Sequence, residues 1–259
     1  MDLTIVAYHR VKDFIDPYFK ARTLSVVKFM DQIAHIQRHY NVIKGNDLIK
    51  AAIGDYQLPE NACLLTFDDG YLDHFINVFP ILDKKGLSGC FFPVPDCTNR
   101  VLAVNKLQMI MGKISISELY SHIVEQVVAH AEKYSLLSPS EYRERFHKSG
   151  RWDSANFMFC KKMLQHGLPF ELRTSIIDNL FRLTVTSDES AISEQLYMTV
   201  DQLRTLKWCA HYIGSHGHDH VWMDTLTSQE QTQEIDKSLA FLASVGADTR
   251  RWIMCYPYG

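Results

Sequence analysis

Two adjacent acidic residues, Asp68 and Asp69, directly follow the apolar run Cys63–Phe67. Such a run is typical of a short buried strand, so the two carboxylates would lie where that strand ends. Like charges held close together raise each other's pKa, which makes the ionised pair unfavourable. A bound metal ion would relieve this repulsion, and the two acids could then take different chemical roles.

Two histidines that could complete such a site lie far along the chain, in the segment Gly214–His220. His216 and His220 are four residues apart, so on a helical turn their side chains would share a face, with His218 pointing elsewhere. Imidazole suits zinc and similar transition metals, and Asp69 would add one oxygen to two nitrogens. That set leaves a position open for water, as catalytic zinc sites require. The alternative is a polar loop that happens to be rich in histidine.

Short apolar runs alternate with helical segments, which predicts an α/β fold with a mostly parallel sheet. The candidate strands are Leu3–Ala7, Tyr40–Ile43, Cys63–Phe67, Gly89–Phe92, His211–Gly214 and Trp252–Tyr256. Capping-box spacings predict helix starts at Thr199 with Gln202 and at Thr227 with Glu230. The reactive residues follow strands, and sites in this fold class form at the carboxyl ends of parallel strands. We therefore expect them to converge on one mouth.

The stretch 96–196 breaks the alternation, because it holds helical patterns and no convincing strand. At Ser138 an N-cap residue is followed by proline and, three positions on, by an acid, which is typical of a helix start. We predict an all-helical insertion at 96–196 that separates a first part of the main domain, 1–95, from a second part, 197–259.

Composition narrows the classes of function. The 259 residues are 46% hydrophobic, which suits a globular protein, and 27 basic and 30 acidic residues give a net charge of −3. The charges are intermixed, so no nucleic-acid partner is expected. No apolar stretch is long enough to span a bilayer, and the first residues do not resemble a signal peptide. The six cysteines form no CxxC pair. A cytoplasmic protein with reduced thiols is therefore expected.

The motifs carry a family resemblance. Thr66–Tyr71, read as TFDDGY, resembles the first motif of the polysaccharide deacetylase (NodB-homology) family of carbohydrate esterases. His216–His220 is similar to the second motif, His-x-x-x-His, and Tyr256–Gly259 to the end of the third. Tyr8–Val11 is similar to the opening of many members. The order of the motifs matches, and the resemblance covers most of the chain outside the predicted insertion.

The resemblance implies a distorted (β/α) barrel of about seven strands and metal-dependent removal of an N-acetyl group from a carbohydrate, either a polysaccharide or a glycan precursor. For a cytoplasmic enzyme the precursor is the favoured substrate. The resemblance also implies that Asp69, His216 and His220 bind a divalent metal, that Asp68 is the general base and that the backbone N–H of Tyr258 stabilises the oxyanion. Zinc is the expected metal, with cobalt, nickel and manganese as alternatives.

The chain departs from the family pattern near its end and in the size of the insertion. The family usually has an arginine before the proline-rich turn, where it orients the base, and Cys255 stands there instead, with Arg250 and Arg251 nearby. Later motifs, including a general-acid histidine, would follow Gly259. We therefore expect the natural chain to continue and the barrel to be incomplete here. His9, at the mouth of the first strand, is a candidate for the missing acid.

Three residues near the expected mouth are assigned to substrate binding, namely His9, Trp222 and Pro257. Trp222 lies two positions past His220, where it could stack on a sugar ring or pack at the rim. Two alternative functions remain open. One is a metal-dependent amidase that acts on a small non-sugar substrate, because a fold does not fix a substrate. The other is a non-catalytic binding protein that retains the metal. The oligomeric state is not predicted.

Overall fold

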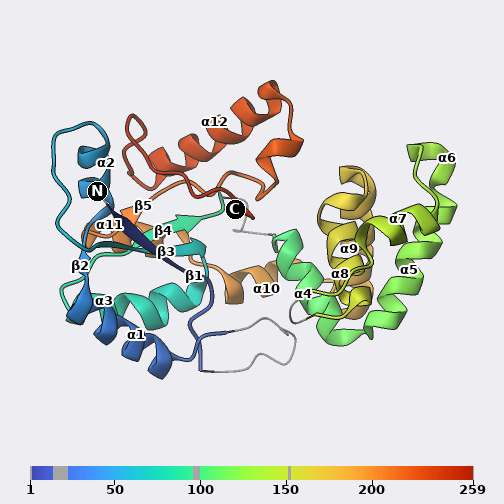
Figure 1. Cartoon of the computed structure of the whole chain (residues 1–259), viewed down its shortest axis with the longest axis horizontal. Coiled ribbons are helices and arrows are strands. Elements are labelled where there is room, and N and C mark those ends of the chain that lie inside the picture. The colour runs from blue at the N-terminus through green and yellow to red at the C-terminus, as the bar shows by residue number, and fades with distance from the viewer. Residues whose placement is uncertain (1, 14–22, 96–99, 151–152, 259) are drawn as a thin grey trace. The chain divides into compact units, whose positions relative to one another are not determined.

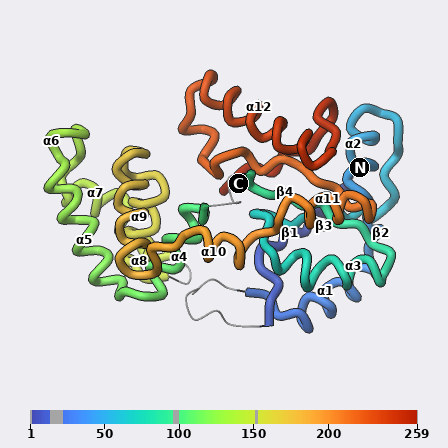
Figure 2. Tube along the Cα trace, turned by 180° about the vertical axis from the view of Figure 1, so that it is seen from behind, coloured from blue at the N-terminus to red at the C-terminus, as the bar shows by residue number. Residues whose placement is uncertain are grey.

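The computed structural model of the chain describes residues 2–13, 23–95, 100–150 and 153–258 (Figure 1; Figure 2 gives the view from behind). It divides into two compact units. The first holds the sheet and consists of Met1–Ile15, Arg22–Arg100 and Ser190–Gly259. The second consists of Asp16–Ala21 and Val101–Glu189.

The sheet of the first unit is parallel throughout, as predicted. Its strands are β1 (Leu3–Tyr8), β2 (Asn41–Val42), β3 (Ala62–Asp69), β4 (Cys90–Pro93) and β5 (Tyr212–Ile213). The order is β1-β3-β4-β5, and β2 pairs with the first two residues of β3. Since β1 runs along Ala62–Phe67 on one edge of β3, β2 and β4 share the other edge. The strand predicted at Trp252–Tyr256 is reduced to an isolated parallel bridge between Ser215 and Met254.

The pairing register brings the carboxyl ends of the strands to one level. Tyr8 lies beside Phe67 in the ladder, and Asp69 lies beside Pro93. The last residues of β1, β3 and β4 therefore open onto the same edge. The segment that carries His216 follows β5 directly at that edge, as the sequence predicts.

Alternate residues of β3 face two different cores, because successive side chains of a strand point to opposite faces. Cys63, Leu65 and Phe67 belong to a cluster that includes side chains from the surrounding helices. Ala62 and Leu64 belong to a second cluster with residues of β4 and β5 and with Ile43, which follows β2. Every residue of β3 is buried. This explains its continuous apolar sequence, in contrast to the polar-apolar alternation of a strand with one solvated face.

Helices cover both sides of the sheet. They are α1 (Val26–His39), α2 (Gly45–Ala52), α3 (Phe79–Lys84), α10 (Glu189–Leu196), α11 (Val200–Trp208) and α12 (Ser228–Ser244). In Figures 1 and 2, α12 lies on one side of the sheet and α1 and α3 lie on the other. The predicted capping boxes are present: Thr199 Oγ1 accepts from the N–H of Gln202, and Thr227 Oγ1 accepts from the N–H of Glu230.

The regular elements of the second unit are all helical within its described residues. They are α4 (Ala103–Lys113), α5 (Ile116–Ala129), α6 (Ala131–Tyr134), α7 (Pro139–Phe146), α8 (Ala155–Lys162) and α9 (Phe170–Thr184). The helix start predicted at Ser138 is present, and Ser138 forms a capping box with Glu141. The buried ammonium of Lys106 ties α4 to α9 through Asp178, at 2.7 Å. No described helix of either unit is long and apolar enough to cross a bilayer.

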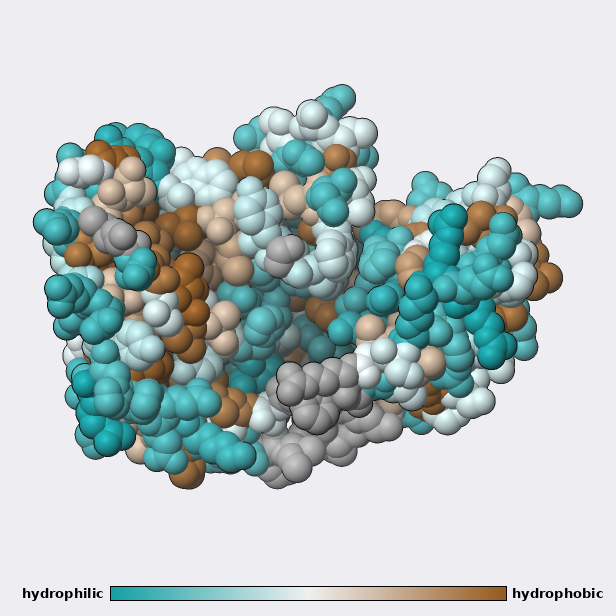
Figure 3. Space-filling view, viewed as in Figure 1, coloured by the Kyte–Doolittle hydropathy of each residue, from teal (hydrophilic) through white to brown (hydrophobic). Residues whose placement is uncertain are grey.

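β1 is the first strand in the sheet order, and most of its residues are at least partly exposed. The side chain of Ile5 is 58% exposed, although isoleucine is usually buried. Figure 3 shows apolar side chains gathered over this part of the first unit. The face of β1 is therefore an apolar surface on a unit whose other long strand, β3, is completely covered.

Candidate metal centre

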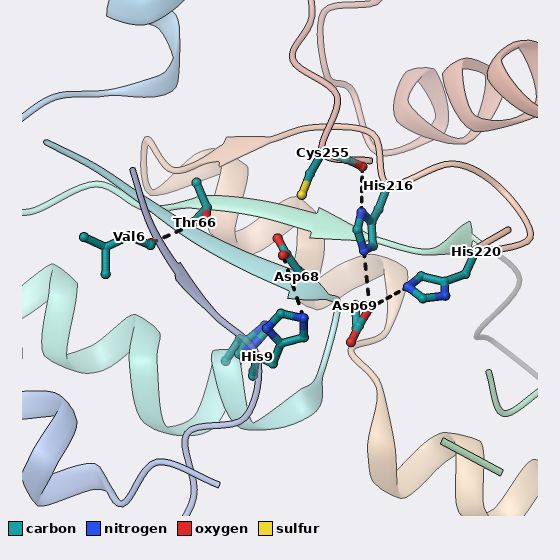
Figure 4. A network of polar contacts seen from close by, with 9 residues as sticks. Val6, His9, Thr66, Asp68, Asp69, His216, His220 and Cys255 are labelled. Atoms are coloured by element: carbon teal, nitrogen blue, oxygen red, sulfur yellow. Dashed lines mark hydrogen bonds and ion pairs between the residues drawn. The ribbon is translucent and has the colours of Figure 1, made fainter. Parts of the chain in front are cut away.

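Asp69, His216 and His220 converge at the carboxyl edge of the sheet (Figure 4). Oδ1 of Asp69 lies 3.4 Å from Nε2 of His216 and 3.2 Å from Nε2 of His220. One ligand atom from each of the three residues lies within 4.8 Å of the others. The three side chains come from two segments of the chain that are about 150 residues apart, as the spacing of the motifs implies.

The backbone of β3 separates the two acids. Asp68 continues the row of Ala62 and Leu64, while Asp69 continues the opposite row, because side chains alternate along a strand. Asp69 also has a φ of 70°, in the left-handed region that aspartate tolerates better than most residues. The chain turns here, and the carboxylate of Asp69 is thereby directed at the histidines while that of Asp68 is not.

The two histidines come together through a loop. The prediction that a helical turn would align His216 with His220 is wrong, because the segment between them is irregular. Gly217 has a φ of 74° and His220 a φ of 52°, so two left-handed residues fold the backbone back. The imidazole rings end with their centres 5.0 Å apart. The side chains therefore converge as predicted, but by a different backbone path.

Side chains of α12 hold this loop from behind. Oε1 of Glu234 accepts hydrogen bonds from the backbone N–H groups of His218 and Asp219, both at 2.6 Å. One helical turn further along, the hydroxyls of Ser215 and Ser238 are hydrogen-bonded at 2.7 Å. Both Glu234 and Ser238 are buried. Hydrogen bonds to a buried carboxylate are strong, so α12 fixes the loop between the two imidazoles.

A backbone carbonyl sets the tautomer of His216. Its Nδ1–H donates to the carbonyl oxygen of Cys255 at 2.7 Å. In the neutral ring this leaves the lone pair on Nε2, which faces Asp69. Metal-binding histidines are usually oriented in this way through their other nitrogen.

Asp69 and His216 shift each other's pKa. Burial alone would raise the pKa of Asp69, but close contact with the imidazoles of His216 and His220 outweighs burial and holds that pKa well below its usual value. Burial would likewise lower the pKa of His216, but the Asp69 carboxylate and the contact with Cys255 raise it to about 10. Without a metal, a proton therefore takes the cation's place between these two side chains.

The donor set fits a divalent metal ion. Oδ1 of Asp69 is buried and has no hydrogen-bond partner of good geometry, although two imidazole nitrogens lie close to it. Leaving a buried carboxylate oxygen unpaired is costly. Two imidazoles and one carboxylate match the protein ligands of catalytic zinc sites, and they also suit cobalt, nickel and manganese.

The family model for polysaccharide deacetylase matches residues 55–259. The chain belongs to this family. Membership indicates a carbohydrate deacetylase, and the family predicted from the motifs is confirmed. Among curated proteins, none matches the sequence.

Solved structures of deacetylases share the fold over 99% of this chain. The deacetylase PplD of Streptococcus pyogenes, in complex with acetate, has a TM-score of 0.53 at 13% identity over 74% of its chain. IcaB from Ammonifex degensii has 0.52 at 16% over 74%, and a de-N-acetylase from Aggregatibacter actinomycetemcomitans has 0.53 at 16% over 79%. The predicted fold class, an α/β fold with a parallel sheet like that of the (β/α)-barrel deacetylases, is confirmed. The described sheet has five strands, fewer than the seven or so that the resemblance implies.

Asp68 of this deacetylase lies beside the candidate metal ligands in a mostly enclosed position, with its side chain 7% exposed. Nε2 of His9, on a side chain that is 60% exposed, lies 4.0 Å from Oδ2 of Asp68. The thiol of Cys255 points toward the same carboxylate (Figure 4). Burial raises the pKa of Cys255, so the group in the arginine's place is a neutral thiol. Arg250 and Arg251 do not take the place of the arginine that the family has beside the base. Both side chains are exposed, and both residues come before Met254, which forms the bridge with Ser215.

An aromatic stack borders the candidate site. The ring of Tyr258 lies parallel to that of Trp222, with their centres 4.8 Å apart and an angle of 6° between them. The centre of the His220 ring is also 4.8 Å from that of Tyr258. Tyr258 has a φ of 65°, and Pro257 before it is buried. Trp222 therefore packs on Tyr258 with one face. Gly259 of the third motif lies outside the described residues.

A buried ion pair behind Asp68 was not predicted from the sequence. Nε of Arg10 donates to Oδ2 of Asp73 at 2.7 Å, and both side chains are 6% exposed. The guanidinium also lies over the ring of Tyr71, 4.6 Å from its centre. The pair joins the end of β1 to the turn after β3, and so supports the backbone from which both acids project.

The raised pKa of His216 predicts a pH-dependent metal affinity. The metal-free protein keeps the proton on this ring from pH 6.5 up to about 10, so its stabilising contact with Asp69 is fully present below 6.5 and is lost towards 10. A metal must displace this proton. We expect release of about one proton per ion near pH 7, and an affinity that rises about tenfold per pH unit up to pH 8. Titration calorimetry in buffers of different ionisation enthalpy measures both, and a heat independent of the buffer would contradict this view.

Removal of the Glu234 carboxylate should lower metal affinity, although it changes none of the three candidate metal ligands. Glu234→Ala leaves two backbone N–H groups of the loop without their acceptor, and we expect metal affinity to fall about 10- to 100-fold. Glu234→Gln keeps a carbonyl acceptor and should recover most of the affinity. Asp236→Ala, an exposed change on the same helix, is the control. Competition with a fluorescent chelator gives the affinities, and equal values for all three variants would show that Glu234 does not position the loop.

Proposed function

We propose that this deacetylase is a metal-dependent hydrolase that removes the acetyl group from an N-acetylated sugar of a polysaccharide or glycan precursor. The observation that supports it is the convergence of Asp69, His216 and His220 around one buried carboxylate oxygen that has no hydrogen-bond partner of good geometry. We assign these residues as ligands of a divalent cation, with zinc as the first candidate because of the two imidazole donors. Family membership supports the carbohydrate substrate.

The residues around the three ligands suit amide hydrolysis. Bound there, a divalent cation supplies Lewis-acid chemistry that an amide carbonyl and a water molecule both need. Asp68 is next to the ligands but directed to another face of β3, so we assign it as the base that takes a proton from the attacking water. We assign the backbone N–H of Tyr258 as the donor to the developing oxyanion, worth roughly 3 kcal/mol in the transition state. Trp222 would hold Tyr258 in place through the stacked rings.

His9 is our candidate for delivering a proton to the departing amine. Its imidazole is exposed at the edge of the site and lies 4.0 Å from Oδ2 of Asp68, so a proton accepted by Asp68 has a nearby carrier. This position also allows His9 to contact the sugar. The neutral Cys255 thiol leaves Asp68 without the guanidinium that usually accompanies the base in this family.

Acetate release tests the proposal directly. We expect the zinc-loaded protein to release acetate from N-acetylated amino sugars or their oligomers, and a chelator to abolish release until metal is restored. Enzyme-coupled measurement of acetate on a panel of acetylated sugars and small amides gives the result. Release from small amides alone would indicate an amidase. Tight metal binding with no acetate from any substrate would indicate a binding protein.

Asp68→Asn separates metal binding from proton transfer. The amide has nearly the same size but cannot accept the proton, so we expect metal affinity within about threefold of the parent and turnover reduced by 10²–10⁴-fold. Asp69→Asn is the matched comparison, because it should weaken metal binding itself. Turnover of the metal-loaded Asp68→Asn protein at the parent rate would remove Asp68 from the base role.

A further inference from the structure

A cleft of about 900 Å³ lies at the end of the first unit opposite the metal centre. Two chain segments connect the two sites. β5 starts with Tyr212 in the cleft and leads to His216 at the metal centre, and the last segment leads from Arg251 in the cleft to Cys255. The cleft is therefore at the amino ends of strands whose carboxyl ends carry the chemistry, and it is not part of the active site.

The walls of the cleft are strongly basic. They carry five basic side chains, which are Lys44, Lys50, Lys207, Arg250 and Arg251. All five residues are exposed. The single acidic residue of the lining, Asp248, accepts a hydrogen bond from the backbone N–H of Arg250 and lies 3.7 Å from Nε of its guanidinium, so it offsets one of these charges. The whole chain has a net charge of −3, so this excess of positive charge is local. Such a concentration of charge in a concavity attracts anions.

The start of a helix forms part of the wall. α2 begins in the cleft, with Lys44 as its N-cap and Gly45 as its first residue, and the carboxylate of Asp47 in its first turn accepts a hydrogen bond from the N–H of Lys44. Gly45 packs tightly on β5, because a Cβ at this position would lie 2.4 Å from Cγ of Tyr212. The first turn of α2 is thus held firmly against the sheet and forms a fixed wall of the cleft.

We propose that this cleft binds a ligand that carries at least two phosphate groups. The volume is that of a small-molecule site, which is larger than a single inorganic anion requires. Five cations around one cavity are neutralised best by a ligand with several negative charges. Arginine forks match phosphate oxygens in pairs, and lysine ammonium groups add point charges to them. The diphosphate is carried either by a soluble compound or by a lipid head group.

The experiment is a titration of the zinc-loaded, ¹⁵N-labelled protein with inorganic pyrophosphate, followed through its glycine amides. Gly45 and Gly246 line the cleft, whereas Gly217 lies at the metal centre. We expect saturable shifts of the first two with a dissociation constant below about 1 mM. Shifts confined to Gly217, which would indicate capture by the metal, or the absence of shifts up to about 10 mM would overturn the proposal.

Charge-removal variants localise the binding. Arg250→Gln with Arg251→Gln should weaken pyrophosphate binding about tenfold or more, because two forked donors are lost. The control is Lys28→Gln with Arg38→Gln on α1, which removes the same charge from exposed positions outside the cleft. It should change the affinity less than about twofold. Equal weakening in both variants would reduce the effect to overall charge and overturn the proposal.

Two vesicle compositions distinguish the sources of the phosphate. Phosphatidylcholine vesicles with and without a quarter of cardiolipin, whose head group carries two phosphates, are sedimented with the parent protein and with the Arg250→Gln, Arg251→Gln variant. Co-sedimentation of the parent alone, only with the anionic vesicles, assigns the cleft to a lipid head group. Pyrophosphate shifts at Gly45 and Gly246 without co-sedimentation assign it to a soluble diphosphate. Acetate release by the variant should equal that of the parent in either case.

Discussion

The contact between Oδ1 of Asp69 and the two imidazole nitrogens is the constraint on which the rest of the first unit depends. Three ligand atoms within 4.8 Å of one another are tolerable only when a cation, or a proton in its place, lies between them. The protein keeps them there at some cost, with Asp69 and His220 both in the left-handed region. The framework around them opposes relaxation: β3 is buried along its whole length, and Glu234 of α12 holds the loop that carries the histidines.

The parts of this arrangement that could be predicted are those in which a local pattern decides the structure. An apolar run followed by Asp68 and Asp69 places both acids at the end of a buried strand, and the structure has β3 end at Asp69. Capping-box spacing fixes the start of α12 at Thr227, because the hydrogen bonds that form it lie within four residues. The parallel sheet follows from alternation of strands and helices, and it is the sheet that brings distant segments to one edge.

The parts that could not be predicted depend on contacts between remote residues or on backbone dihedral angles. Arg10 and Asp73 are 63 positions apart, and neither has a neighbour in sequence that indicates a buried pair. Glu234 resembles any acid on the solvated face of a helix, and only its burial against the loop shows its role. The spacing of His216 and His220 is compatible with a helix, but the left-handed conformation at Gly217 selects a loop instead. Local patterns do not carry this information, because tertiary packing supplies it.

The left-handed backbone at Asp69 limits how this position can vary over generations of replication. Glutamate has the same charged group, but a φ of 70° is less favourable for it than for aspartate. Its extra methylene would also move the carboxylate oxygen away from its position near the histidines. Asparagine and glycine accept the backbone, yet one lacks the charge and the other lacks the side chain. Position 69 must therefore satisfy two separate requirements, a left-handed backbone and a carboxylate that reaches the histidines. Glutamate is the replacement that sequence similarity scores as mildest, yet it is among those that this position tolerates least.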